Sequence, residues 1–110
     1  MKGGAIVVLM TAPDGRAARR LANVLVDERL AACVTRIGGA RSVYRWKGRV
    51  EESSEILLIA KTRRAVLPAF LKRVQALHPY DVPEILALPL VGGNPAYLSW
   101  LADAAKGDRP

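Results

Sequence analysis

The sequence is poor in cysteine and has no long apolar run. Cys33 is the only cysteine among 110 residues, so no disulfide can form within the chain, and a secreted scaffold held by disulfides is excluded. No segment approaches the ~20 consecutive apolar residues of a membrane-spanning helix, and the apolar stretch near Met1 is too short for a signal peptide. We therefore expect a cytoplasmic protein without a membrane partner.

Histidine is as scarce as cysteine. His78 is the only one, and neither a paired CxxC nor an HExxH motif occurs, so the most specific short signatures of metal sites are missing. The chain also offers no arrangement of serine, cysteine and histidine that suggests a hydrolase. We expect a protein that is not an enzyme.

The length favours one domain. A chain of 110 residues is long enough for one hydrophobic core and too short for two, so we expect a single domain over residues 1–110. Hydrophobic residues make up 51% of the chain, which is more than one small core needs. The surplus is available for a subunit interface.

Strand signals recur along the chain. Apolar, β-branched or alternating segments predict strands at residues 5–11, 31–37 with a continuation at 41–49, 55–62 and 84–91. The segment 55–62 is apolar on both faces in its middle, as expected of a central strand. Pro89 places the last strand at an edge, because proline cannot donate a hydrogen bond to a neighbouring strand.

Helix signals lie between these strands. Asp14 can cap a first helix that ends near Arg29 or Leu30, and Asn94 can cap a short last helix. The apolar residues of a second helix, which Pro79 ends, are Leu67, Phe70, Leu71 and Val74. The order is βαββαβ followed by a helix, which predicts an α+β fold with an antiparallel sheet and the two main helices on one face.

A hairpin is predicted around Lys47-Gly48. A turn centred there places Arg45 opposite Val50 and Tyr44 opposite Glu51. The strand that carries three arginines then lies beside one that carries three glutamates, and we expect these charges to pair across the hairpin. They are Arg41, Arg45 and Arg49 on the first strand, and Glu51, Glu52 and Glu55 on the second.

Four separate motifs carry a resemblance to a known family. ERLAACV at 28–34, SVYRWKGRVE at 42–51, LHPYDVPEI at 77–85 and NPAYLSWL at 94–101 look like the CutA, or divalent-cation tolerance, family. The resemblance runs from Ala5 to Ala102. It implies a ferredoxin-like fold, a homotrimer built by sheet edges and the long hairpin, and a link to divalent cations, copper especially. The trimeric architecture also resembles the PII signalling proteins, which leaves a regulatory or scaffold role open by analogy of fold.

His78 is the first metal candidate, because it is the only imidazole in the chain. In the resembled family the position before Pro-Tyr is among those proposed to bind copper, and His78 matches it. Asp81 and Glu84 follow closely, so an imidazole and two carboxylates converge if the turn folds back. We predict a divalent copper site at His78, Asp81 and Glu84. The competing interpretation is a histidine at a helix C-terminus beside a solvated turn.

Two sulfur-containing residues have ordinary interpretations. Many relatives in the resembled family carry a cysteine at the end of the first strand, where this chain has Met10. A thioether cannot act as a thiolate ligand for Cu(II), and its default role is to fill the core. Cys33 lies in an apolar stretch and is predicted to be a buried small residue. The large aromatics that we expect at a subunit interface or around a cleft between subunits are Tyr44, Trp46, Tyr80, Tyr97 and Trp100.

The net charge of +7 raises nucleic acid as an alternative partner. The basic residues are scattered over several elements, which is more typical of solvated faces than of one binding stripe. RNA-recognition modules of this topology stack bases on aromatics of the first and third strands, whereas 5–11 and 55–62 contain none. An acylphosphatase-like enzyme has even less support, because TAPDGR at 11–16 is not a glycine-rich phosphate loop. A nucleic-acid-binding module stays as the alternative function.

Overall fold

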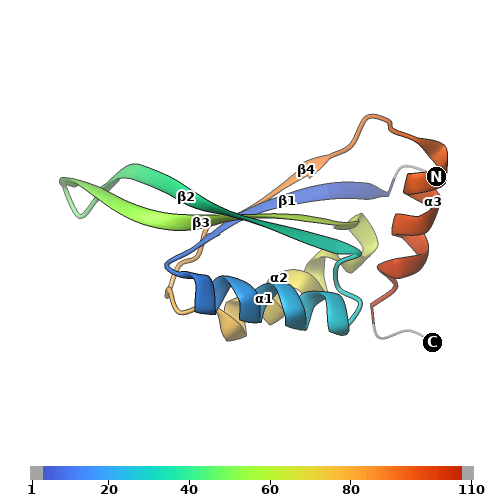
Figure 1. Ribbon diagram of the computed structural model, residues 1–110, viewed down its shortest axis with the longest axis horizontal. Helices are drawn as coiled ribbons and strands as arrows, with labels where there is room; N and C mark the ends of the chain where they lie inside the picture. Colours follow the sequence, from blue (N-terminus) through green and yellow to red (C-terminus); the bar gives the residue numbers. More distant parts are fainter. Residues whose placement is uncertain (1–3, 108–110) are drawn as a thin grey trace.

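A four-stranded antiparallel sheet forms the body of the protein (Figure 1). The computed structural model describes residues 4–107. The strands are β1 (Ala5–Ala12), β2 (Cys33–Trp46), β3 (Arg49–Arg63) and β4 (Ile85–Pro89). Their order β2-β3-β1-β4 confirms the central position of β3 and the edge position of the strand that contains Pro89.

Two helices cover one face of the sheet, as predicted. They are α1 (Gly15–Asp27) and α2 (Leu67–Leu77), the latter preceded by a single 3-10 turn, η1 (Arg64–Val66), and both lie below the sheet in Figure 1. The side chain of Asp14 accepts a hydrogen bond of 2.9 Å from the backbone N–H of Ala17, which confirms the predicted cap. The main core between sheet and helices includes Val8, Met10, Leu21, Leu25, Leu58, Phe70 and Val74.

The hairpin between β2 and β3 has the predicted register, but Arg49, which was expected on the first strand, is the first residue of β3. Arg45 pairs with Val50 and Tyr44 with Glu51, and the two turn residues Lys47 and Gly48 have φ of 52° and 78°, as a two-residue hairpin loop requires. The gap between the predicted segments 31–37 and 41–49, which contains Gly38-Gly39, does not end the strand. It is a shift of register between Ile37 and Ala40 within a continuous β2, which bends the strand without breaking it.

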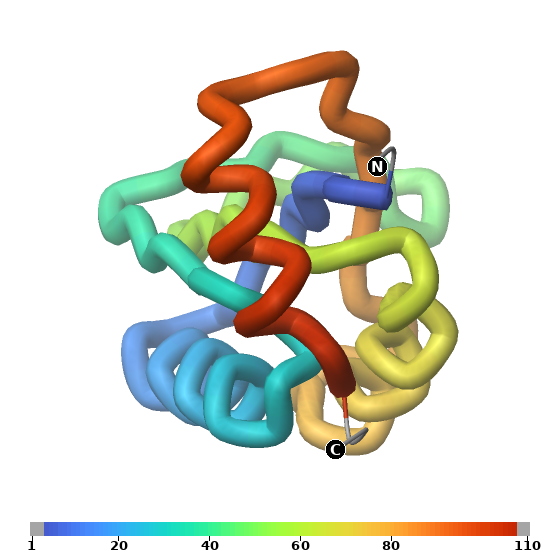
Figure 2. The backbone as a smooth tube through the Cα atoms, turned by 90° about the vertical axis from the view of Figure 1, so that its right-hand side faces the viewer, coloured from blue at the N-terminus to red at the C-terminus, as the bar shows by residue number. Residues whose placement is uncertain are grey.

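A third helix, α3 (Pro95–Ala104), closes the end of the sheet farthest from the hairpin (Figures 1 and 2). Asn94 caps it by accepting a hydrogen bond of 2.9 Å from the backbone N–H of Ala96, as predicted. Leu101 and Ala105 pack with Ala32 in a small second core. No helix within residues 4–107 is long and apolar enough to cross a membrane.

The face of the sheet opposite α1 and α2 is largely uncovered (Figure 1). Strand pairing places seven aliphatic residues on this side, which we call the open face. Three of them, Ile37, Leu86 and Leu88, are 44%, 54% and 49% exposed. The members of the open face are Val7, Leu9, Ile37, Leu57, Ile59, Leu86 and Leu88. A single chain leaves this surface in water.

Candidate functional site

An acidic cleft lies where the hairpin meets the segment between α2 and β4. It has a volume of about 610 Å³. The hairpin of β2 and β3 forms one wall of the cleft, and the segment after α2 forms the opposite wall. β1 contributes Thr11. The residues that line the acidic cleft are Thr11, Ser42, Val43, Tyr44, Trp46, Glu55, Tyr80, Asp81, Val82 and Glu84.

Glu55 is the buried carboxylate of the cleft, with only 7% of its surface exposed. The hydroxyl of Ser42 donates to one carboxylate oxygen at 2.6 Å, and the hydroxyl of Tyr80 donates to the other at 2.8 Å. Ser42 comes from the neighbouring strand and Tyr80 from the segment after α2. The two hydrogen bonds therefore fix the carboxylate and tie the hairpin to the opposite wall of the cleft.

The contact with Glu55 also changes the acidity of Tyr80. Burial raises the pKa of Tyr80 to about 12, and the hydrogen bond donated to Glu55 and the negative charge of that carboxylate add to the effect. All three causes disfavour a second negative charge beside Glu55. Tyr80 therefore stays a neutral hydrogen-bond donor over the physiological range.

Alkaline titration tests this contact. We expect one tyrosine to ionise near pH 12 in the folded protein, against about 10 for an ordinary phenol. Because the folded pKa is raised, the stability from this contact is complete below pH ~10 and is lost as the pH rises toward 12. Spectrophotometric titration should lose its most alkaline step in Tyr80→Phe and keep it in Tyr97→Phe. The same step in both variants would contradict the contact.

His78 is not among the residues that line the cleft, and both of its ring nitrogens form hydrogen bonds with backbone groups. Nε2 lies 2.7 Å from the backbone oxygen of Thr11, which can only accept, so Nε2 carries the proton. Nδ1 accepts a hydrogen bond of 3.1 Å from the backbone N–H of Tyr80. The residue is 7% exposed, and its ring lies 4.9 Å from that of Tyr80. In this arrangement the neutral ring joins the end of β1 to the cleft wall.

The three predicted metal ligands are placed differently. Asp81 and Glu84 are exposed and line the acidic cleft, and the side chain of Gln75 holds the segment by donating to the backbone oxygen of Asp81 at 3.1 Å. His78 is directed at backbone groups instead. Within residues 4–107, no group of three or more His, Cys, Asp or Glu side chains is placed to hold a metal ion. The turn thus brings two of the three side chains to one cleft.

The sequence interpretation missed the role of Glu55. It was expected to pair with an arginine across the hairpin, but its partners are Ser42 and Tyr80. The expected charge pairing occurs once, where Arg41 Nε donates to Glu52 at 2.8 Å on the exposed side. The available signal is the position of Glu55, because the first residue of the predicted strand 55–62 has its side chain on the same face of β3 as Leu57 and Ile59.

The predictions for the two sulfur residues have different outcomes. Met10 is fully buried in the main core, as expected. Cys33 was predicted to be buried, which is wrong: it is half-buried on the edge strand β2, and Lys61 Nζ lies 3.6 Å from its sulfur. A residue on an edge strand has one side open to solvent. An apolar sequence pattern cannot reveal this exposure.

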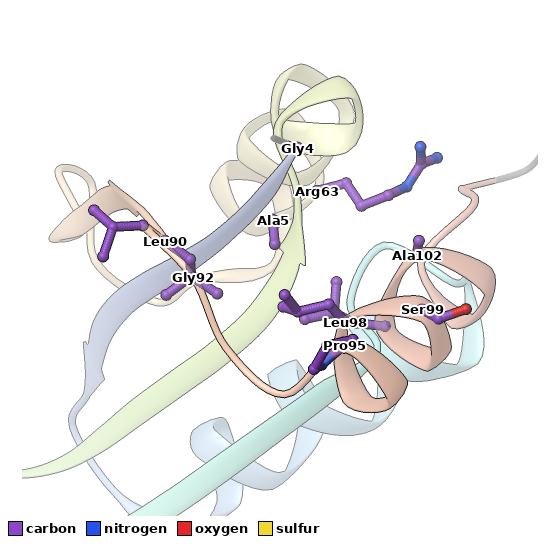
Figure 3. Close-up of a pocket in the computed structure, with 11 residues that line it drawn as sticks. Gly4, Ala5, Arg63, Leu90, Gly92, Pro95, Leu98, Ser99 and Ala102 are labelled. Atoms are coloured by element: carbon purple, nitrogen blue, oxygen red, sulfur yellow. The ribbon is translucent and has the colours of Figure 1, made fainter. Parts of the chain in front are cut away.

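A second hollow of about 660 Å³ lies at the α3 end of the sheet (Figure 3). Figure 3 shows Pro95 and Leu98 facing Ala5 and Gly92 across it. Arg63 lines its edge, but Nε of that side chain donates to the backbone oxygen of Ala105 at 2.7 Å. The hollow has mainly apolar walls and no carboxylate among its lining residues within 4–107. It is therefore less suited to a cation than the acidic cleft.

Comparison with known proteins gives one consistent result. The sequence profile of the CutA1 divalent ion tolerance protein family matches residues 6–104. The divalent-cation tolerance protein CutA of Thermus thermophilus is 53% identical over 88% of this chain and 94% of its own length. The chloroplastic protein CutA of Arabidopsis thaliana is 48% identical over 92% of this chain, which spans 56% of that relative. The crystal structure of CutA1 from Oryza sativa superposes with a TM-score of 0.92, at 47% identity and coverage of 94% and 95% of the two chains.

Proposed function

From the premise that this chain belongs to the CutA1 divalent ion tolerance family, we propose that it is a cytoplasmic, non-catalytic homotrimer that binds divalent cations, copper in particular. The observation that carries the proposal is the charge of the cleft. The chain has a net charge of +7, yet among residues 4–107 those that line the acidic cleft include three carboxylates and no lysine or arginine. Such a cleft attracts cations on an otherwise basic protein.

Two features support self-assembly. The open face exposes Leu86 and Leu88 beside a half-buried aliphatic surface, and contiguous apolar patches of this kind mark interaction sites. The strands β2 and β4 also present unpaired edges at the two sides of the sheet. A trimer is the state that the family resemblance implies, and it would cover both the open face and the edges.

Copper binding at His78 requires one hydrogen bond to be exchanged. The lone pair of Nδ1 receives the backbone N–H of Tyr80, so an ion at this nitrogen competes with that donor. Cu(II) favours imidazole nitrogen, and the exposed carboxylates of Asp81 and Glu84 can supply oxygen ligands nearby. We expect modest affinity, because the imidazole must first leave its present partner.

Calorimetric titration with Cu(II) tests the proposal. Wild type should bind one ion per chain, and affinity should fall as the solution is acidified, because a protonated imidazole has no lone pair to donate. His78→Ala should lose most of the heat, and the double variant Asp81→Asn, Glu84→Gln should bind about tenfold more weakly through loss of two charged ligands. The control is Glu51→Gln, an exposed hairpin residue outside the cleft lining. Equal affinity in all four proteins would reject a specific site.

The size of the cleft favours a second role, as a regulatory or scaffold protein of the PII type. A volume of about 610 Å³ lies in the range of small-molecule sites, which a ligand-responsive regulator needs. The nucleic-acid alternative has less support, because the open face of β1 and β3 offers Val7, Leu9, Leu57 and Ile59, and none of these stacks on a base.

A further inference from the structure

The outer side of α1 is basic. Arg16, Arg19 and Arg20 are separated by three and four positions, so they lie on one side of the helix. The side of α1 that is packed into the main core carries only alanine and leucine. All three guanidinium groups point away from that core and are exposed. We call this group the arginine stripe.

The arginine stripe has no structural partner. Within the described residues, 4–107, its side chains form neither an ion pair nor a hydrogen bond, whereas Arg73 of α2 pairs with Glu28 through two hydrogen bonds. The first turn of α1 has no acidic residue, although a helix N-terminus favours negative charge. Arg16 lies in that turn and also faces Arg19 and Arg20, which have the same charge. These charges destabilise the helix that carries them, which favours a role in binding over a role in folding.

A further cation extends the basic surface onto α2. Figures 1 and 2 show α1 and α2 side by side on one face of the sheet. Lys72 is exposed, and it lies two positions from each of the buried residues Phe70 and Val74, on the opposite side of α2. Both helices lie opposite the open face. An assembly that covers the open face therefore leaves the arginine stripe and Lys72 in water.

The composition of this surface favours a partner of high negative charge density. A guanidinium group presents a planar fork of donors that matches phosphate. The residues that continue the stripe along α1, Asn23 and Asp27, are exposed and polar. A protein interface has an apolar core, and a helix that binds in a membrane surface inserts an apolar side, so neither partner suits this side of α1. Binding by charge alone is strong with a nucleic acid, because counterions are released from its phosphates.

We propose that the outer side of α1 binds the phosphate backbone of a double-stranded nucleic acid. Arg16, Arg19 and Arg20 each contact a phosphate group, and Lys72 adds to the attraction. Binding is independent of base sequence, because phosphate contacts carry no sequence information. The lack of aromatics on β1 and β3 does not affect this surface, which lies on the other side of the sheet. The inference goes beyond cation binding and does not depend on it, because no residue of the stripe lines the acidic cleft.

Fluorescence anisotropy with a short labelled DNA duplex tests the proposal, with a chelator present to remove metal ions. Three phosphate contacts predict a slope of about −2.7 in a plot of log association constant against log salt concentration. That slope corresponds to an about fortyfold loss of affinity between 50 and 200 mM salt. The triple variant Arg16→Gln, Arg19→Gln, Arg20→Gln should lose most of the slope and should keep the circular dichroism of wild type. A duplex of unrelated sequence should bind wild type equally well.

A second triple variant separates the stripe from the net charge of the protein. Arg29→Gln, Arg49→Gln, Arg64→Gln changes three exposed arginines outside α1, and each triple variant lowers the net charge of +7 by three. The second variant should keep most of the affinity and the slope of wild type. Equal losses in the two variants would show attraction to net charge alone and overturn the proposal. A wild type that binds anionic lipid vesicles but not the duplex, or that binds neither at 50 mM salt, also overturns it.

Discussion

Leu88→Asp is expected to convert the assembled protein into monomers. Leu88 lies on the open face next to Val7, and 49% of its surface is exposed in the single chain. The substitution therefore leaves the core of the folded chain unchanged. In an assembly that covers the open face, each new carboxylate is buried without a partner, which costs about 3–5 kcal/mol per copy. That cost weakens association by at least about a hundredfold for each copy.

Sedimentation equilibrium at micromolar concentration measures the effect directly. Wild type should have the mass of a trimer and Leu88→Asp that of a monomer, with the same far-UV circular dichroism in both. Val26→Asp is the matched control, because Val26 is similarly exposed at 43% but belongs to α1, which packs against the opposite face of the sheet. A monomeric wild type would contradict the proposed trimer. A trimeric Leu88→Asp would mean that the subunit interface does not cover Leu88.

Local chemistry explains why much of the fold could be predicted. The turn at Lys47-Gly48 sets the register of the hairpin as far as the pair of Ala40 and Glu55, because a two-residue loop pairs Trp46 with Arg49 and the next pairs follow. The caps at Asp14 and Asn94 act on backbone groups two or three residues away. Each of these signals lies within a few residues of the structure that it determines.

The cleft could not be predicted in the same way, because its contacts join distant residues. Glu55 meets Ser42 and Tyr80 across 13 and 25 positions, and His78 meets Thr11 across 67. The sequence favoured an arginine partner for Glu55 because arginines on one strand of the predicted hairpin lie beside glutamates on the other. Ser42 is a diagonal neighbour of Glu55 in the register that the turn sets, but Tyr80 reaches Glu55 from the segment after α2, and no local signal predicts that contact.

Two hydrogen bonds connect His78, Tyr80 and Glu55. An ion that takes the lone pair of His78 Nδ1 releases the backbone N–H of Tyr80, whose hydroxyl orients Glu55. A metal ion at His78 would therefore act on the buried carboxylate of Glu55 through one residue, Tyr80.

Phe70→Ala should have the largest effect on stability of any single change considered. The sequence pattern assigned both Phe70 and Leu71 to the buried face of α2, but Phe70 is 0% exposed in the main core and Leu71 is 39% exposed. The buried stripe of α2 is therefore narrower than the i, i+3, i+4 spacing predicts, because only residues that face the main core, such as Phe70 and Val74, are covered. Removing a fully buried phenyl ring leaves a cavity and costs about 3–5 kcal/mol.

The adjacent Leu71→Ala provides the comparison, since it removes apolar atoms from the same helix at a position that is 39% exposed. It should change the free energy of unfolding by less than about 0.5 kcal/mol, as surface substitutions usually do. Urea unfolding followed by circular dichroism gives both values, and all proteins must be compared at one protein concentration because assembly contributes to apparent stability. Equal losses for the two variants would mean that Leu71 is covered in the assembled protein, and α2 would then belong to a subunit interface.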